Sequence, residues 1–88
     1  MAWDIRFSPR ASKSFKKLDT VERRRISTFL REVAALEDPR SRGKALTANK
    51  AGLWRWRVGD YRVVADIVDD QVVVVVVDVG HRSKIYID

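Results

Sequence analysis

Three arginines stand close together in the segment 52–62, GLWRWRVGDYR, beside two tryptophans and a tyrosine. The Gly-Asp pair within it is typical of a two-residue hairpin turn, which would set residue 57 opposite 62 and residue 58 opposite 61. Strand alternation then places Arg55, Arg57 and Arg62 on one face. Because guanidinium groups bind phosphate through paired hydrogen bonds, these arginines could hold a phosphodiester.

The predicted register makes Arg57 and Arg62 a cross-strand pair of like charges, which destabilises a hairpin by about 0.2 to 1 kcal/mol. Arginines on an exposed face are often simply solvated, but three that converge favour a phosphate-binding site. Tryptophans beside arginines could also stack on bases. The register assigns them instead to the opposite, core-forming face. That face comprises Trp54, Trp56, Val58, Tyr61, Val63 and Ala65.

Proton transfer would need other side chains, because arginine stays protonated. Strand alternation past the valine run brings His81, the only histidine in the sequence, to the arginine face. A lone histidine is more often structural than catalytic, but for one that lies between Gly80 and Arg82 at a strand end, on the face of the arginines, the two roles are about equally expected. One histidine, no cysteine and scattered carboxylates do not provide a metal site. With no phosphate-binding loop, nucleophile elbow or dinucleotide motif, no cofactor is expected.

The charge of the chain points to a polyanionic partner. Its 88 residues carry a net charge of +6, and the sequence pI is about 10.2. A basic composition of this kind is compatible with nucleic-acid binding. The absence of cysteine and of an apolar segment long enough for a membrane leads us to expect a cytoplasmic protein. Six basic residues and no acid fall between 40 and 57: Arg40, Arg42, Lys44, Lys50, Arg55 and Arg57.

The elements that must position these residues are expected in the order β-α-α-β-β-β, within one domain that spans residues 1–88. The segment 2–7 alternates as a strand, and Ser8 and Pro9 are typical of a helix start. Asp19 and Glu22 predict a capping box for a second helix that ends near Pro39. Strands are predicted at 53–58, 61–68 and 71–79. The apolar stripes of the helices are Ala11, Phe15 and Leu18 in the first, and Val21, Ile26, Phe29, Leu30, Val33 and Leu36 in the second.

This pattern predicts an α+β fold, with an antiparallel helix pair packed on one face of a mainly antiparallel four-stranded sheet. The run Val72–Val77 predicts a central strand that is buried on both faces. Helices can cover only one face, so the valines on the arginine side need another cover. The tail of the chain, the arginine stems or a polypeptide partner could provide it. Leu46 is the one large apolar anchor in the basic loop 40–52.

The C-terminal half, LWRWRVGDYRVVADIVDDQVVVVVVDVGHRSKIY, resembles RelE-type toxins of the RelE/ParE superfamily. The likeness extends back through KAL to the opening W-x-I-x-F-S-P-x-A. It implies a type II toxin that cleaves mRNA in the ribosomal A site without a metal, using the RNA 2′-hydroxyl as nucleophile. It also implies the ribosome, mRNA and a cognate protein antitoxin as partners. The toxin–antitoxin complex is expected to bind operator DNA through the antitoxin, and no membrane is involved.

By position, the resemblance makes Arg62 and Arg82 catalytic arginines and matches Tyr86 to the C-terminal tyrosine of the family. Attack by a 2′-hydroxyl needs a base, donors for the phosphorane oxygens and an acid for the leaving oxygen. We expect Arg62 and Arg82 to stabilise the transition state, Tyr86 to act as or to orient the base, and His81 to serve as auxiliary acid. The residues expected to bind RNA phosphates are Arg42, Lys44, Lys50, Arg55 and Arg57.

Other functions fit the same sequence. One is a ParE-type gyrase poison, which binds a protein–DNA complex and generally lacks the catalytic residues. Another is an inactive homologue that only binds its antitoxin. His81 would support this hypothesis, because the family often has lysine at that position. A plain RNA-binding domain would show a stacking motif or a glycine-rich clamp, and the sequence has neither. Arg62, Arg82 and Tyr86 together favour the nuclease.

Overall fold

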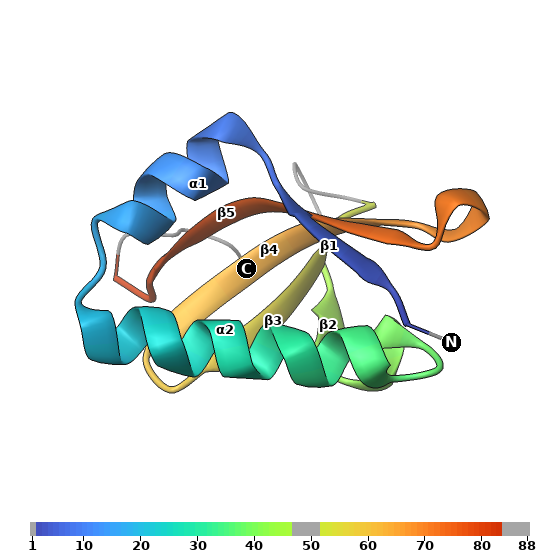
Figure 1. The fold of residues 1–88 in the computed structure, drawn as a ribbon, viewed down its shortest axis with the longest axis horizontal. Coiled ribbons are helices and arrows are strands. Elements are labelled where there is room, and N and C mark those ends of the chain that lie inside the picture. Colours follow the sequence, from blue (N-terminus) through green and yellow to red (C-terminus); the bar gives the residue numbers. More distant parts are fainter. Residues whose placement is uncertain (1, 47–51, 84–88) are drawn as a thin grey trace.

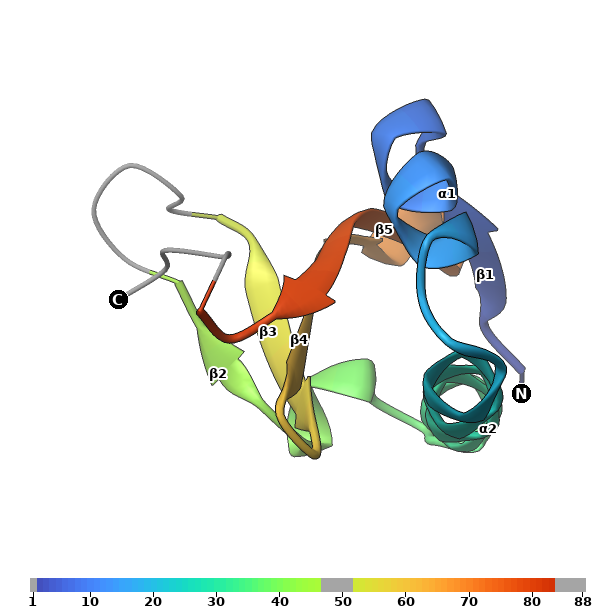
Figure 2. The same cartoon turned by 90° about the vertical axis from the view of Figure 1, so that its left-hand side faces the viewer.

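Two helices lie on one face of a five-stranded sheet in the computed structural model, which describes residues 2–46 and 52–83 (Figures 1 and 2). The predicted α+β class and element order are confirmed, with one further strand. The strand order is β1-β5-β4-β3-β2. The elements are β1 (Asp4–Phe7), α1 (Pro9–Lys16), α2 (Thr20–Ala35), β2 (Lys44–Ala45), β3 (Trp54–Val58), β4 (Tyr61–Val68) and β5 (Val73–His81).

The helix starts follow the sequence closely, with one difference. Ser8 caps α1, because its Oγ accepts a hydrogen bond from the Ala11 amide at 3.1 Å. Asp19 is the N-cap of α2, but its side chain makes no capping hydrogen bond. The predicted capping box is therefore not formed. Glu22 instead places a carboxylate oxygen 3.8 Å from Arg25, one turn further along the helix.

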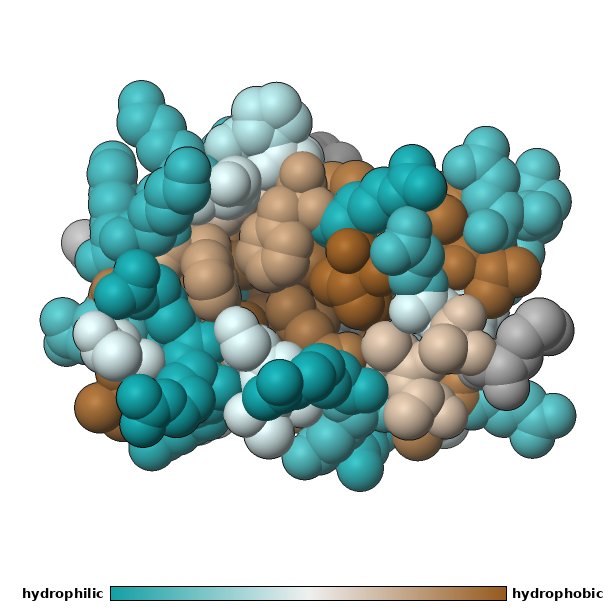
Figure 3. Space-filling model, viewed as in Figure 1, coloured by the Kyte–Doolittle hydropathy of each residue, from teal (hydrophilic) through white to brown (hydrophobic). Residues whose placement is uncertain are grey.

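The two helices diverge from their short connection, so the predicted antiparallel pair is an open one (Figure 1). α1 packs mainly on β5, whereas α2 contacts β1 and β3. Figure 3 shows apolar surface in the space between the helices, bordered by hydrophilic side chains. Half-buried side chains that pack on the core include Ile5, Phe7 and Phe15.

The core lies between α2 and the sheet, and α2 contributes the fully or nearly buried Ile26, Leu30 and Val33. Val21 was predicted in the same stripe, but its side chain is 63% exposed. The spacing explains the error: a stripe through residues 26, 30 and 33 continues backwards to 22 or 23 and not to 21. The sheet contributes Trp56, Val58, Val63, Ala65, Ile67, Val74, Val76 and Val79.

The β3–β4 hairpin has the predicted register, with Arg57 opposite Arg62 and Val58 opposite Tyr61. The next connection is longer than predicted. It forms a 3-10 turn over Asp69–Gln71, and Val72 adopts a left-handed conformation with φ of 55°. β5 therefore begins at Val73 and not at residue 71. It lies between β1, which is parallel to it, and the antiparallel β4, so β5 is an interior strand as predicted, although β4 is the central one. Val75 and Val77 are only partly buried, so the predicted burial of β5 on both faces is incomplete.

A bulge interrupts the pairing of β4 with β5. Val64 pairs with Asp78, whereas the next residue, Ala65, pairs with Val76. Val77 is thus an extra residue on β5, and the alternation of faces shifts by one position beyond it. Beyond the bulge, Val79 and His81 lie on the helix-facing side of the sheet, opposite to the predicted side.

A second, smaller cluster covers part of the arginine side of the sheet. Leu46 and Val64 are buried there, and Leu53 and Val77 pack against them. The valines on this side are thus partly covered by residues that flank the segment 47–51, and Leu46 is the apolar anchor that the sequence predicted. None of the helices in the described part of the chain is both long and apolar enough to span a membrane.

Arg40 joins the start of the basic loop to the turn between β4 and β5. Its two terminal nitrogens each donate to a different carboxylate oxygen of Asp69, both at 2.9 Å. These hydrogen bonds lower the pKa of Asp69 below its ordinary value of 3.8. Arg40 is therefore neutralised locally and does not add to the positive field of the basic loop.

The Arg40–Asp69 pair should make stability depend on pH in the acid range. Since the folded-state pKa of Asp69 is lowered, its contribution is complete above the unfolded-state pKa and is lost as pH falls through the folded-state value. We expect Asp69→Asn to lower the free energy of unfolding at neutral pH, and the difference from the wild type to vanish in strong acid. Denaturant unfolding at a series of pH values measures this. Asp70→Asn is the matched control, because among the described residues Asp70 has no ion pair.

Candidate active site

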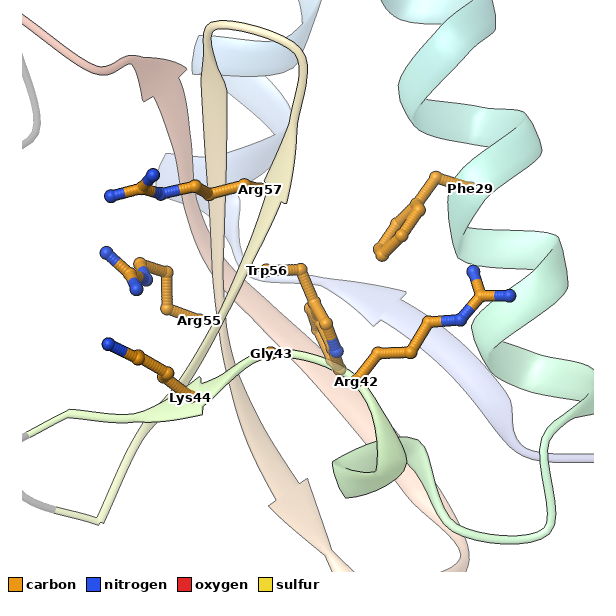
Figure 4. Close-up of a pocket in the computed structure, with 7 residues that line it drawn as sticks. All are labelled: Phe29, Arg42, Gly43, Lys44, Arg55, Trp56 and Arg57. Carbon is orange, nitrogen blue, oxygen red and sulfur yellow. The ribbon is translucent and has the colours of Figure 1, made fainter.

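Four basic side chains project from the face of the sheet that is turned away from the helices. The register places Lys44 of β2 opposite Arg55 of β3, and Arg57 of β3 opposite Arg62 of β4. Figure 4 shows Lys44, Arg55 and Arg57 pointing in the same direction, away from α2, with Trp56 on the other side of β3. We refer to Lys44, Arg55, Arg57 and Arg62 as the cationic face.

A small depression at the end of the hairpin brings Arg57 and Arg62 together with Arg82. Its volume is about 70 Å³, and the turn residues 59–61 complete its wall. The amide of Arg82 donates to the carbonyl of Asp60 at 2.8 Å, which holds the chain beyond β5 against the turn. Gly80 lies opposite Arg62 and has no side chain to fill the space. The two arginines predicted to be catalytic therefore line one depression.

The arginines of the cationic face differ in burial. Arg55 is only 7% exposed, Arg62 is half-buried and Arg57 is exposed. A partly buried guanidinium keeps one orientation and acts across a lower effective dielectric than water, so its attraction for a phosphate is stronger. The cationic face thus combines two oriented guanidinium groups, those of Arg55 and Arg62, with the solvent-accessible one of Arg57.

Lys44 reaches this face because the chain crosses the edge of β3 at Gly43. Trp54 donates from Nε1 to the Arg42 carbonyl at 2.6 Å, just before the crossing. Gly43 has φ of +92°, and a Cβ there would lie 2.3 Å from the Arg55 carbonyl oxygen. No other residue fits this conformation and this space. Sequence reasoning missed both β2 and this glycine, for which the only signal was its presence in the basic loop.

Arg42 was predicted to bind RNA, but it does not belong to the cationic face. Its side chain turns toward α2, where Nη1 lies 3.0 Å from Glu32. Its guanidinium carbon also lies 5.9 Å from the centre of the Phe29 ring (Figure 4). The crossing at Gly43 separates Arg42 from Lys44, because the two side chains leave the chain on opposite sides of β3. Two other predicted residues, Lys50 and Tyr86, lie outside the described residues.

His81 lies on the helix-facing side of the sheet and not on the cationic face as predicted. It pairs with Tyr61, and the two rings meet edge to face with centroids 5.5 Å apart. The bulge at Val77 is the cause, since it reverses the alternation on which the prediction rested. The His81 Nδ1 atom lies 2.8 Å from the Ser83 hydroxyl oxygen.

The sequence matches, over residues 5–86, the family described as the ParE toxin of type II toxin–antitoxin systems, parDE. This chain belongs to that toxin family. It is 36% identical over 90 residues to the mRNA interferase toxin RelE of Escherichia coli K12, a match that covers 96% of this chain and 87% of the relative. The mRNA interferase RelE of Shigella flexneri matches to the same extent.

Solved structures of toxin–antitoxin complexes share the fold of this toxin. The RelBE2 complex of Mycobacterium tuberculosis matches with a TM-score of 0.85 and 27% identity, covering 96% of this chain and 95% of that one. The intact E. coli RelBE complex matches with a TM-score of 0.73 and 28% identity, covering 91% of this chain and 96% of that one. The RelE/ParE-like fold that the sequence resemblance implied is thus confirmed.

The like-charge pair in this toxin should reduce its stability. We expect Arg57→Gln to raise the free energy of unfolding by about 0.2 to 1 kcal/mol at low salt, because it removes the repulsion from Arg62 across the strands. The gain should shrink at about 1 M salt, where charges are screened within roughly 3 Å. Denaturant unfolding at two salt concentrations measures both effects. Arg24→Gln, on the exposed side of α2, is the control for the loss of one positive charge; an equal gain there would contradict the paired repulsion.

Proposed function

We propose that this chain is the toxin of a type II toxin–antitoxin system and that it inhibits translation by cleaving mRNA on the ribosome. The observation that carries the proposal is the grouping of Arg57, Arg62 and Arg82 around one depression on a rigid sheet. Its relative in E. coli, at 36% identity, is named an mRNA interferase. Action on the ribosome is the reason to propose that the protein works in the cytoplasm.

The proposed reaction is an in-line transfer at phosphorus. The 2′-oxygen of the RNA forms a bond to the adjacent phosphorus, and the bond from phosphorus to the 5′-oxygen breaks. The products are a 2′,3′-cyclic phosphate and a 5′-hydroxyl. Negative charge grows on the non-bridging oxygens as the phosphorane forms, and Arg62 and Arg82 are the donors that stabilise it. Arg57, Arg55 and Lys44 hold the phosphate backbone on either side.

The proton of the 2′-hydroxyl must be accepted, and one must reach the leaving 5′-oxygen. Tyr86, which lies outside the described residues, remains the proposed base or its orienting partner because its position in the sequence resembles that of the C-terminal tyrosine of the family. His81 has no part in this step, since its side chain lies on the other face of the sheet, so the proton for the leaving 5′-oxygen comes from solvent water. No cofactor enters the proposed reaction.

The small size of the arginine depression supports the proposed dependence on the ribosome. A volume of about 70 Å³ is far below the roughly 300 to 1,000 Å³ of pockets that enclose a small molecule. It is suited to a phosphate group and does not enclose a nucleotide. We infer that the toxin supplies charges while the ribosome holds the RNA in the reactive geometry. Positioning of this kind accounts for a large part of a catalytic rate.

The proposed partner in the resting state is a cognate antitoxin. A segment with acidic residues would neutralise the cationic face, and its apolar residues would cover what remains of the valine surface beside it. Its relatives from M. tuberculosis and E. coli were solved as toxin–antitoxin complexes. The complex would bind operator DNA through the antitoxin.

A gyrase poison is the competing function, and the description of the matched family as ParE toxins favours it. Induction of the toxin in cells separates the two, with primer extension on a translated mRNA and a gyrase supercoiling assay run in parallel. Cleavage of the mRNA and normal supercoiling are expected. Intact mRNA with inhibited gyrase would establish the alternative. Intact mRNA with active gyrase would indicate a module that only binds its antitoxin.

A further inference from the structure

A second pocket opens on the helix-facing side of the sheet, between the end of α1 and the end of β5. Its volume is about 420 Å³, within the range of pockets that hold a small molecule. Tyr61 and His81 contribute aromatic rings to it, α1 contributes Arg10, the residue after α1 contributes Lys17, and β5 contributes Asp78. The function derived so far makes no use of these side chains.

This pocket adjoins the arginine depression. Tyr61 lines both, on the helix-facing side with His81 and at the turn with Arg62 and Arg82. His81 and Arg82 are neighbours in the chain, and the bond from the Arg82 amide to Asp60 holds both residues at the end of the sheet. Tyr61 is thus common to the two sites, which meet at the end of the sheet.

The chemistry of the pocket suits a nucleobase. Tyr61 and His81 offer aromatic surface, and the edge-to-face contact together with Ser83 fixes the imidazole in one orientation. The Asp78 carboxylate already accepts from the Val79 amide at 2.9 Å and lies 3.4 Å from Arg10. A carboxylate has about four acceptor positions, so Asp78 retains capacity for the amino groups of a base. Lys17 adds a positive charge for a neighbouring phosphate.

We propose that this pocket binds the base of the nucleotide next to the cleaved phosphodiester, with that base lying against the Tyr61–His81 pair. The proposal rests on the proposed function and adds a contact through which the toxin itself selects among bases. It also gives His81 a role that its position on the helix-facing side allows.

The test uses the single imidazole of the chain as its reporter. His81 is the only histidine among the 88 residues, so its ring protons give unambiguous NMR signals in the untagged, full-length toxin. The toxin is titrated with each of the four nucleoside 5′-monophosphates, and ribose 5-phosphate is the control without a base. We expect nucleotides to shift the His81 signals, and at least one to bind about fivefold more tightly than ribose 5-phosphate, the lower end of the contribution of one base stack.

Two adjacent lysines supply matched variants. Lys17 lines the pocket, and Lys16, one residue before it, does not. We expect Lys17→Ala to weaken nucleotide binding about two- to fivefold and Lys16→Ala to leave it unchanged. Equal effects of the two variants would indicate a general attraction of anions to α1 and would contradict the proposal that the pocket binds a base. So would equal binding of ribose 5-phosphate, or His81 signals that no nucleotide shifts.

The binding measurement does not depend on nuclease activity. A toxin that binds nucleotides at His81 but leaves mRNA intact on the ribosome would refute the proposed function and retain the pocket. A toxin that cleaves mRNA but shows no base-dependent shift of the His81 signals would refute only the proposal that the pocket binds a base.

Discussion

Replacement of Arg62 with alanine is expected to lower the rate of ribosome-dependent mRNA cleavage by about 10²- to 10³-fold, the usual effect of removing one donor that stabilises developing charge. Arg62 is the key residue of the proposed site because it lies opposite Arg57 in the hairpin and lines the same depression as Arg82. The rate is measured by single-turnover cleavage on stalled ribosomes, with toxin in excess.

Two further variants make the Arg62 experiment specific. Arg62→Lys keeps the charge but loses the paired donors of the guanidinium, so its rate should lie between those of the wild type and the alanine variant. Arg31→Ala removes an exposed arginine of α2 on the far side of the sheet and should retain nearly the full rate. Equal losses in Arg62→Ala and Arg31→Ala would contradict a localised site and indicate that only the total charge matters.

Gly43→Ala is expected to destabilise the toxin by about 2 to 5 kcal/mol. The positive φ of +92° contributes about 1 to 2 kcal/mol of this for any residue with a Cβ. The remainder comes from overpacking, because the new Cβ would lie 2.3 Å from the Arg55 carbonyl oxygen and 2.8 Å from the Trp56 ring. Neither the β3 backbone nor the buried indole can move away freely. Denaturant unfolding measures the change.

Gly52 is a natural control for this prediction. Its φ of +93° matches that of Gly43, but a Cβ there would meet nothing within 4 Å. Gly52→Ala should therefore lose only the backbone contribution of about 1 to 2 kcal/mol. Equal losses in the two variants would show that the chain does not approach β3 closely at Gly43. The Gly43 variant should also cleave more slowly under folding conditions, because the crossing is what carries Lys44 to the cationic face.

The features that the sequence predicted correctly are the local ones. A two-residue turn fixes the pairing of its flanking strands, so the turn at 59–60 placed Arg57 opposite Arg62 and Trp56 in the core. Ser8 capped its helix as predicted, because its partner is only three residues away. In each case the residues that decide the structure are neighbours in the chain.

Two local predictions failed, the capping box of Asp19 and the burial of Val21, but the other features that the sequence could not predict depend on distant contacts. Identical valines carry no information on register, so the run 72–77 could not reveal the bulge that reverses His81. Arg42 and Arg40 appeared to be part of the basic field, but they are paired with Glu32 and Asp69, which are 10 and 29 residues away. Likewise, glycine is required at position 43 only because the folded chain passes close to β3 there. Tyr86 and Lys50 remain predictions from the sequence.

The most direct test of the account is the chemical nature of the new RNA ends. An mRNA fragment released from ribosomes by the purified toxin is treated with a phosphatase before and after mild acid, which opens cyclic phosphates. Attack by the 2′-hydroxyl, with charge stabilised by Arg62 and Arg82, predicts a 2′,3′-cyclic phosphate on the upstream fragment and a 5′-hydroxyl on the downstream fragment. A 3′-hydroxyl upstream with a 5′-phosphate downstream would show that water is the nucleophile and would contradict the account.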